Sequence, residues 1–294
     1  MSAVAASAEH LGKTIGDRVV LNDISAQVRP GDVVGIIGKN GAGKTTLLET
    51  LLGLSMRSSG SSTVLGEDSL HLSTAAKQRI GFVPQQEELI PALSGRRQLA
   101  LTGSFYRNWD RELVARLATE WEVPLDRRAH TLSGGERQKL STLMALGNHP
   151  DLLVLDEPVA SLDPVARRKF LQQVLEIASD NSRAVIFSTH IVSDLERVAN
   201  RIWILKDGRL IWDGETDALK ESVVRLHIRA RAVLPQDLGI PNCLSTRRSA
   251  DGLSATVAVR DLSVTDTDAL ASRLGVDIER EGLGLEDIFL EIHS

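Results

Sequence analysis

A glycine-rich loop is the first segment of the sequence whose residue types could carry out chemistry. Residues 38–45 read Gly-Lys-Asn-Gly-Ala-Gly-Lys-Thr and fit the phosphate-binding pattern of Gly, four residues and Gly-Lys-Thr. Glycines let the backbone curl so that N–H groups point at phosphate oxygens. Lys44 would place its charge on the β- and γ-phosphates, and the Thr45 hydroxyl would coordinate Mg²⁺. The loop therefore predicts a nucleoside triphosphate site, whose expected binding residues are Gly38, Asn40, Gly41, Ala42, Gly43, Lys44, Thr45 and Thr46.

An acidic pair at the end of an apolar run could supply the other half of this site. Leu152–Leu155 leads directly into Asp156 and Glu157. A strand that ends in acid can place a carboxylate beside the phosphate loop, where Asp156 would hold Mg²⁺ through water. Glu157 would face the γ-phosphate and accept a proton from an attacking water. Taken alone, the pair is equally compatible with an ordinary polar strand end, and the phosphate loop favours the catalytic interpretation.

Short apolar runs alternate with helical patterns and predict the elements that position these groups. The runs 33–37, 152–155 and 184–187 are typical of strands buried on both faces of a parallel sheet. Between the last two, Asp163 is a good N-cap and Pro164 suits the first helical position. Strand, helix and strand form the crossover unit of an α/β fold.

Length and composition exclude several classes of protein. The 294 residues carry a net charge of −5 and 42% hydrophobic residues, an acidic balance that argues against a nucleic-acid partner. The single cysteine, Cys243, excludes an internal disulfide framework and a cysteine-rich zinc site, and it fits a reducing compartment. No run approaches the ~18–20 apolar residues that cross a bilayer. We therefore expect a soluble, cytosolic chain whose membrane-spanning partner, if any, is separate.

The chain divides into parts of different character. Residues 1–8 lack a charged leader and are expected to be a frayed terminus rather than a signal peptide. Residues 9–221 are expected to form the nucleotide-binding domain, with a helical insertion at about 90–147. Residues 222–294 are predicted to be a small α+β accessory domain. A folding or dimer-stabilising role is favoured for it over a regulatory or partner-binding role.

Further motifs make the chain resemble the ATP-binding cassette (ABC) ATPases. Residues 131–138 resemble the signature motif of that family, and 81–85 resemble its Q-loop. Residues 161–163 resemble the D-loop, and 188–190 resemble the switch-histidine motif. With the phosphate loop and the acidic pair, these motifs occur in family order over roughly residues 8–220. The resemblance implies a P-loop NTPase of ABC type, with an antiparallel β subdomain and a helical subdomain.

The resemblance also implies roles and partners. Two copies would pair head to tail in the ATP-bound state, with ATP and Mg²⁺ between them and with Ser133, Gly134 and Gly135 of each copy at the ATP of the other. Gln85 would ligate Mg²⁺ or the attacking water, and His190 would contact the γ-phosphate. The expected catalytic residues are thus Glu157, His190, Gln85 and Lys44, and the expected metal ligands are Thr45, Gln85 and Asp156.

Some positions depart from the family pattern or rest on it alone. Asp163 of the D-loop-like segment is expected near the nucleotide by resemblance. Many ABC ATPases stack adenine on an aromatic residue, and Ile15 aligns with that position. Ile15 can pack on the base but has no π-face, which predicts weaker adenine selectivity. Glu136 stands where the family frequently has Gln.

The resemblance is strongest to ATP-binding subunits of exporters whose permease is a separate polypeptide. This resemblance rests on the short spacing between Gln85 and Ser133, on residues 106–110 and on residues 285–290 near the end of the sequence. The resemblance implies that the chain hydrolyses ATP at the cytoplasmic face of the inner membrane. This hydrolysis would power export through an integral membrane permease. A non-transport ABC protein that acts as a nucleotide-gated regulatory or binding module is the alternative, and import is a third possibility.

Overall fold

The computed structural model describes residues 4–86, 88–159, 161–178 and 182–293, and the chain forms two compact units. Unit 1 is Met1–Asp213 and unit 2 is Gly214–Ser294. The division falls earlier than the expected position between residues 221 and 222. The reason is the short helix α8 (Thr216–Ser222), which packs on elements of unit 2. Among the described residues, no helix has the length and apolar character that crossing a membrane would require.

A six-stranded sheet forms the centre of unit 1, with strand order β10-β9-β3-β8-β7-β6. The adjacent strands from β9 to β6 run parallel to one another, so their carboxyl ends meet at one edge of the sheet. β9 and β10 are joined by Asp207 and Gly208, both at positive φ, as a tight hairpin turn requires. The strands are β3 (Val33–Ile37), β6 (Ile80–Val83), β7 (Leu152–Asp156), β8 (Ala184–Ser188), β9 (Arg201–Lys206) and β10 (Arg209–Glu215).

A second, antiparallel sheet in unit 1 has the strand order β2-β1-β4-β5. β1 (Ala6–Ile15) lies between β2 (Arg18–Val28) and β4 (Ser59–Val64), and β5 (Glu67–Asp68) follows. Ala6 pairs with both neighbouring strands and is 1% exposed. The expected frayed terminus is therefore wrong for residues 6–8, because strand pairing orders them, whereas residues 1–3 lie outside the described residues.

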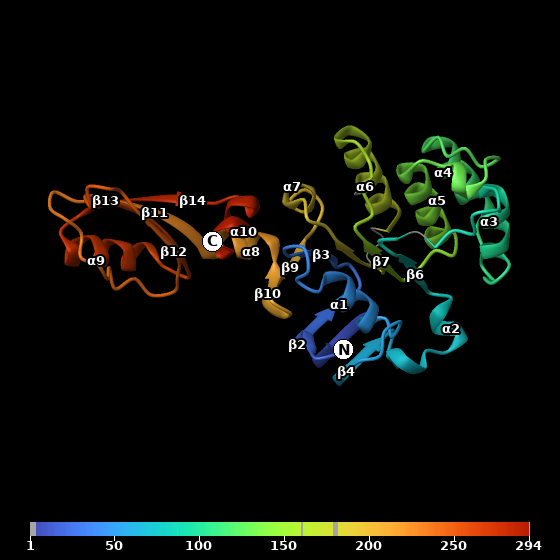
Figure 1. The fold of residues 1–294 in the computed structure, drawn as a ribbon, viewed down its shortest axis with the longest axis horizontal. Helices are drawn as coiled ribbons and strands as arrows, with labels where there is room; N and C mark the ends of the chain where they lie inside the picture. Colours follow the sequence, from blue (N-terminus) through green and yellow to red (C-terminus); the bar gives the residue numbers. More distant parts are fainter. Residues whose placement is uncertain (1–3, 87, 160, 179–181, 294) are drawn as a thin grey trace. The chain divides into compact units, whose positions relative to one another are not determined.

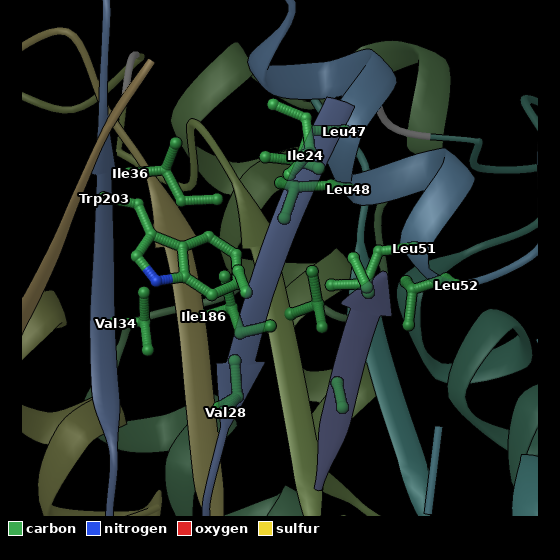
Figure 2. Packing of buried hydrophobic residues seen from close by; sticks show 14 of the residues in the cluster. Ile24, Val28, Val34, Ile36, Leu47, Leu48, Leu51, Leu52, Ile186 and Trp203 are labelled. Carbon is green, nitrogen blue, oxygen red and sulfur yellow. The ribbon is translucent and has the colours of Figure 1, made fainter. Parts of the chain in front are cut away.

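The core of unit 1 lies around α1 (Lys44–Leu51), the helix that follows the phosphate loop. Leu47, Leu48 and Leu51 are almost completely buried and pack with side chains from both sheets, as Figure 2 shows. Trp203 of β9 fills the space beside them and is 1% exposed. The packing fixes the start of α1, and with it the loop, against the carboxyl edge of the parallel strands.

Leu48→Ala is expected to lower the free energy of unfolding of unit 1 by about 2–5 kcal/mol, because it leaves a cavity in this core. Leu54→Ala is the matched control, since Leu54 is 62% exposed and its truncation should change stability by about 0.5 kcal/mol or less. All four tryptophans belong to unit 1, so the midpoint of denaturant unfolding followed by their fluorescence measures this unit. Equal midpoints for the two variants would contradict the assignment of this core.

Helices form the rest of unit 1. α3, α4 and α5 pack together in the helical subdomain (Figure 1), within the predicted insertion. Asp163 Oδ1 accepts the N–H of Ala166 at 3.0 Å, so it caps α6 as expected. The helices are α2 (Thr74–Lys77), α3 (Gly95–Gly103), α4 (Arg111–Glu120), α5 (Gly134–Leu146), α6 (Pro164–Ala178) and α7 (Val192–Leu195), with 3₁₀ turns η1 (Ser69–His71) and η2 (Ala129–Thr131).

Unit 2 is an α+β unit with an antiparallel sheet of strand order β12-β13-β11-β14. Glu291 is 2% exposed and accepts hydrogen bonds from Ser245, Arg225 and Arg247. Burial opposes its ionisation, but the Ser245 and Arg225 hydrogen bonds outweigh burial and hold the pKa of Glu291 below its ordinary value. The other elements are β11 (Val223–Arg229), β12 (Cys243–Arg248), β13 (Ser254–Arg260), α9 (Val264–Leu274), β14 (Asp277–Gly282) and α10 (Leu285–Ile292).

Candidate functional site

A cleft of about 450 Å³ lies at the carboxyl edge of the parallel strands in unit 1. It brings together most of the residues that the sequence predicted for one nucleotide site. Two further lining residues, Arg18 and Val20, were not predicted. Arg18 is brought to the cleft by the register of β1 and β2, in which it pairs with Ile15 across a two-residue turn. The lining residues are Ile15, Arg18, Val20, Asn40, Gly41, Gly43, Lys44, Thr45, Thr46, Gln85, Glu157 and His190.

The phosphate loop has a backbone that only glycine accommodates at two positions. Gly41 has φ 79° and Gly43 has φ 105°, the left-handed region that side chains disfavour. A Cβ on Gly38 would lie 2.5 Å from the carbonyl oxygen of Leu205. The loop thus packs tightly against β9 while its other side lines the cleft. Lys44 is 8% exposed, and its Nζ donates to the carbonyl oxygen of Gly38 at 2.9 Å.

The tips of β7 and β8 place acidic and imidazole groups next to Lys44. Glu157 is 5% exposed, and its Oε1 lies 3.6 Å from Nζ of Lys44. Its Oε2 lies 2.8 Å from Nδ1 of His190, so the imidazole N–H donates to the carboxylate. One carboxylate therefore contacts both a cation of the phosphate loop and the histidine of the next strand. Such an arrangement can activate a water and stabilise a transferring phosphoryl group.

The residues expected to bind Mg²⁺ offer oxygen atoms of the kind this ion prefers. Asp156 is 1% exposed, and its Oδ1 accepts the Ser188 hydroxyl at 2.5 Å. Its Oδ2 is buried and has no hydrogen-bond partner among the described residues. Thr45 Oγ1 and Gln85 Oε1 lie 3.4 Å apart. These oxygens fit a Mg²⁺ ion that takes its remaining ligands from phosphate and water, and the described residues hold no cluster of three His, Cys, Asp or Glu side chains suited to a metal.

The signature-like segment starts α5 with a reciprocal cap. Ser133 Oγ accepts the N–H of Glu136 at 3.2 Å, and Glu136 Oε2 accepts the N–H of Ser133 at 2.7 Å. The hydrogen bond from the Ser133 N–H holds the pKa of Glu136 below its ordinary value. Glu136 therefore keeps the helix start in place where the family frequently has Gln.

Some predicted site residues do not line the cleft of their own chain. Ser133, Gly134, Gly135 and Asp163 are described residues, and none of them belongs to the lining of the cleft. Gly38, Ala42 and Asp156 are also absent from that lining, although they lie beside lining residues in the chain. The structure therefore collects the loop, Gln85, Glu157 and His190 in one place and leaves the start of α5 outside it.

Comparisons with known proteins identify the class that this fold and site define. The profile of the family described as ABC transporter matches residues 21–160. Nod factor export ATP-binding protein I of Burkholderia orbicola (strain AU 1054) is 32% identical over 308 residues, which cover 99% of this chain and 98% of that protein. The chain belongs to the ABC transporter family and is an ABC ATPase domain. Because the alignment spans nearly the whole chain, the relative also contains the region of unit 2.

Solved structures show the same fold. The structure titled "Structure of ATP binding subunit of ABC transporter" has a TM-score of 0.65 and 25% identity, and covers 74% of this chain and 92% of that one. A dimeric ATP-binding cassette in a post-hydrolysis state, bound to ADP and phosphate, has a TM-score of 0.64 and 23% identity. This match covers 71% of this chain and 98% of that one. The predicted P-loop NTPase fold of ABC type is confirmed.

Proposed function

We propose that this chain is the ATP-hydrolysing subunit of an exporter whose permease is a separate polypeptide. The observation that carries the proposal is the contact series Lys44–Glu157–His190 at the tips of β7 and β8, beside a complete phosphate loop. Relatives over 30% identical along nearly the full chain are named as export ATP-binding proteins, which supports export over import. The substrate is chosen by the permease.

The chemistry follows from the positions of the cleft residues. Lys44 and the N–H groups of residues 38–46 hold the β- and γ-phosphates of ATP, and Lys44 gives up its carbonyl contact to do so. Thr45, Gln85 and Asp156 would hold Mg²⁺, and the ion would neutralise phosphate charge. Glu157 orients a water molecule and takes its proton as the water oxygen attacks the γ-phosphorus, and ADP leaves. His190 contacts the Glu157 carboxylate through Nδ1, and with both ring nitrogens protonated it would donate its Nε2–H to the γ-phosphate.

The cleft is completed by a second copy of the chain. The backbone N–H groups at the start of α5 and the Ser133 hydroxyl do not line the cleft of their own chain. A helix start of this kind favours an anion. In a head-to-tail homodimer, Ser133, Gly134 and Gly135 of each copy meet the γ-phosphate held by the other, with Asp163 at the same interface. ATP binding therefore closes the dimer, and hydrolysis reopens it.

The permease contacts the helical subdomain. A cleft of about 590 Å³ there is lined by apolar groups that include Leu99, Trp109 and Val114, and by Arg107 and Arg111. Neither guanidinium has a hydrogen-bond or ion-pair partner among the described residues. An acidic amphipathic segment of the permease complements this surface. The chain is thereby held at the cytoplasmic face of the membrane.

A pull-down from detergent-solubilised membranes tests the transporter assignment. Tagged Glu157→Gln chain with ATP and Mg²⁺ is expected to recover a polytopic membrane protein, identified by mass spectrometry. The same bait with Arg107→Glu and Arg111→Glu should lose it, while its tryptophan fluorescence remains that of a folded unit 1. Recovery of soluble partners alone, with the bait dimeric, would instead favour the nucleotide-gated regulatory module.

Ile15 is expected to limit the selectivity of the cleft for adenine. Ile15 is 57% exposed and lines the cleft with Arg18, so the base meets an aliphatic group and a guanidinium rather than an aromatic ring. Ile15→Tyr should tighten ATP binding by up to about 1–3 kcal/mol, the usual contribution of a stacked base. Val19→Tyr is the matched control, because Val19 is 59% exposed but does not line the cleft. Calorimetric titration with ATP and GTP measures both; unchanged affinity in Ile15→Tyr would place the base elsewhere.

A further inference from the structure

Gln138 is a buried polar side chain that the proposed mechanism does not use. It lies near the start of α5 and is 2% exposed. Its Nε2 donates to the main-chain carbonyl of Glu157 at 2.8 Å, and its Oε1 accepts the N–H of Ser161 at 3.3 Å. Only this orientation of the amide matches a donor with an acceptor at both ends. One side chain thus links α5, the catalytic segment after β7 and the segment that precedes α6.

The backbone of Glu157 depends on such links. Its φ is 51°, a left-handed conformation that residues other than glycine rarely adopt. Its N–H donates to Ser188 Oγ at 2.9 Å, and its carbonyl oxygen accepts from Gln138. The two hydrogen bonds fix the peptide units on both sides of Glu157. They therefore fix the direction in which its carboxylate leaves the backbone toward Lys44 and His190.

The same helix begins with the segment that is proposed to contact the ATP of the partner. Gln138 follows Gly135 by less than one helical turn, so the two positions lie in the same turn of α5. A Cβ on Gly134 would lie 3.1 Å from Ser161, and one on Gly135 would lie 2.9 Å from Leu162. The helix start is thus packed closely on the segment that Gln138 also holds. One hydrogen bond, from Gln138 Nε2, therefore connects this helix with the carbonyl oxygen of Glu157.

We propose that Gln138 is a positioning residue that couples the two ATP sites of the dimer, an inference that rests on the proposed head-to-tail arrangement. In that dimer, the start of α5 contacts the ATP of the partner, while Gln138 holds Glu157 at the ATP of its own chain. Occupancy of one site therefore sets the geometry of the general base in the other. Gln138 contacts no reacting atom, so its effect falls on kcat and on cooperativity rather than on ATP affinity.

Gln138→Met tests this coupling, because methionine has a similar length and removes both hydrogen bonds. We expect kcat to fall about tenfold, less than the roughly 10²–10⁴-fold cost of losing the general base itself. The wild-type cooperativity in ATP should disappear, and the Kd for ATP should stay unchanged. Thr142→Val is the matched control: Thr142 is fully buried in the same helix, and its hydroxyl bonds to the main chain of Gln138 at 2.9 Å. It should keep both kcat and cooperativity.

The outcomes separate this inference from its alternatives. Wild-type kcat and cooperativity in Gln138→Met would overturn it, as would a wild-type chain without cooperativity. Equal losses in Thr142→Val would indicate a general defect of α5 packing and would also overturn it. If Gln138→Met does not fold, Gln138→Asn replaces it, since it keeps a buried amide too short for both contacts, and the same losses are expected. A failure of the proposed function shows itself separately, as ATP hydrolysis that Glu157→Gln leaves unchanged or as a chain that stays monomeric with ATP.

Discussion

Glu157→Gln is expected to lower the rate of ATP hydrolysis by about 10²–10⁴-fold, the usual cost of losing a general base. The amide keeps the size of the side chain but cannot take a proton from the attacking water. ATP binding should persist, because the phosphate loop and Lys44 are untouched. Release of phosphate at saturating ATP and Mg²⁺ measures the effect.

The same variant should also accumulate the closed dimer. Hydrolysis is the step proposed to reopen it, so light scattering with ATP and Mg²⁺ should show a doubled mass for Glu157→Gln. Glu120→Gln is the matched control, since Glu120 lies on α4 and pairs with Arg116 at 2.9 Å, outside the cleft. Equal turnover in Glu157→Gln and wild type would show that another group is the base, and a monomer at saturating ATP would contradict the head-to-tail arrangement.

Lys44→Met is expected to weaken ATP binding by about 1.5–3 kcal/mol, or roughly 10–150-fold in Kd, the range for a hydrogen bond to a charged group. Methionine fills the space of the aliphatic stem, so the loop should keep its conformation while losing the ammonium. Because the ammonium is also proposed to stabilise the transferring phosphoryl group, kcat should fall in addition. Titration with ATP, followed by phosphate release at saturation, separates the two effects.

Lys39→Met is the control for this change, since Lys39 belongs to the same loop but is exposed and does not line the cleft. It should keep wild-type Kd and kcat. If the two variants lost ATP affinity equally, the general positive charge of the loop would be responsible rather than the contact of Lys44.

The features predicted best from the sequence are those determined by residues close together in the chain. The phosphate loop needs glycine at Gly41 and Gly43 for local backbone reasons, and the acidic pair follows directly from the buried strand 152–156. The hairpin at Asp207 and Gly208 is likewise a local property. The D-loop-like segment and Gln85 rested on resemblance, and the cleft contains Gln85 but not Asp163.

What the sequence could not predict depends on pairing over long distances. The small residues at positions 6–8 carry no periodic pattern, and they are ordered because β1 lies between two other strands. Arg18 reaches the cleft only through the β1–β2 register. Gln138 lies 19 residues before Glu157, and no spacing rule connects a helix residue with the strand end on which it acts.

The central position of β3 has a consequence for the synthesis of this protein. Its neighbours in the sheet are β8 and β9, and Val33 pairs with Val185, about 150 residues further along the chain. At the ~5–20 residues per second of translation, the apolar segment Val33–Ile37 waits about 8–30 s on the ribosome before either neighbour exists. During that time it exposes two unpaired strand edges, which favours aggregation. Cells that overproduce this chain should therefore form fewer inclusion bodies when translation is slowed at low temperature or when chaperones that shield nascent chains are supplied in excess.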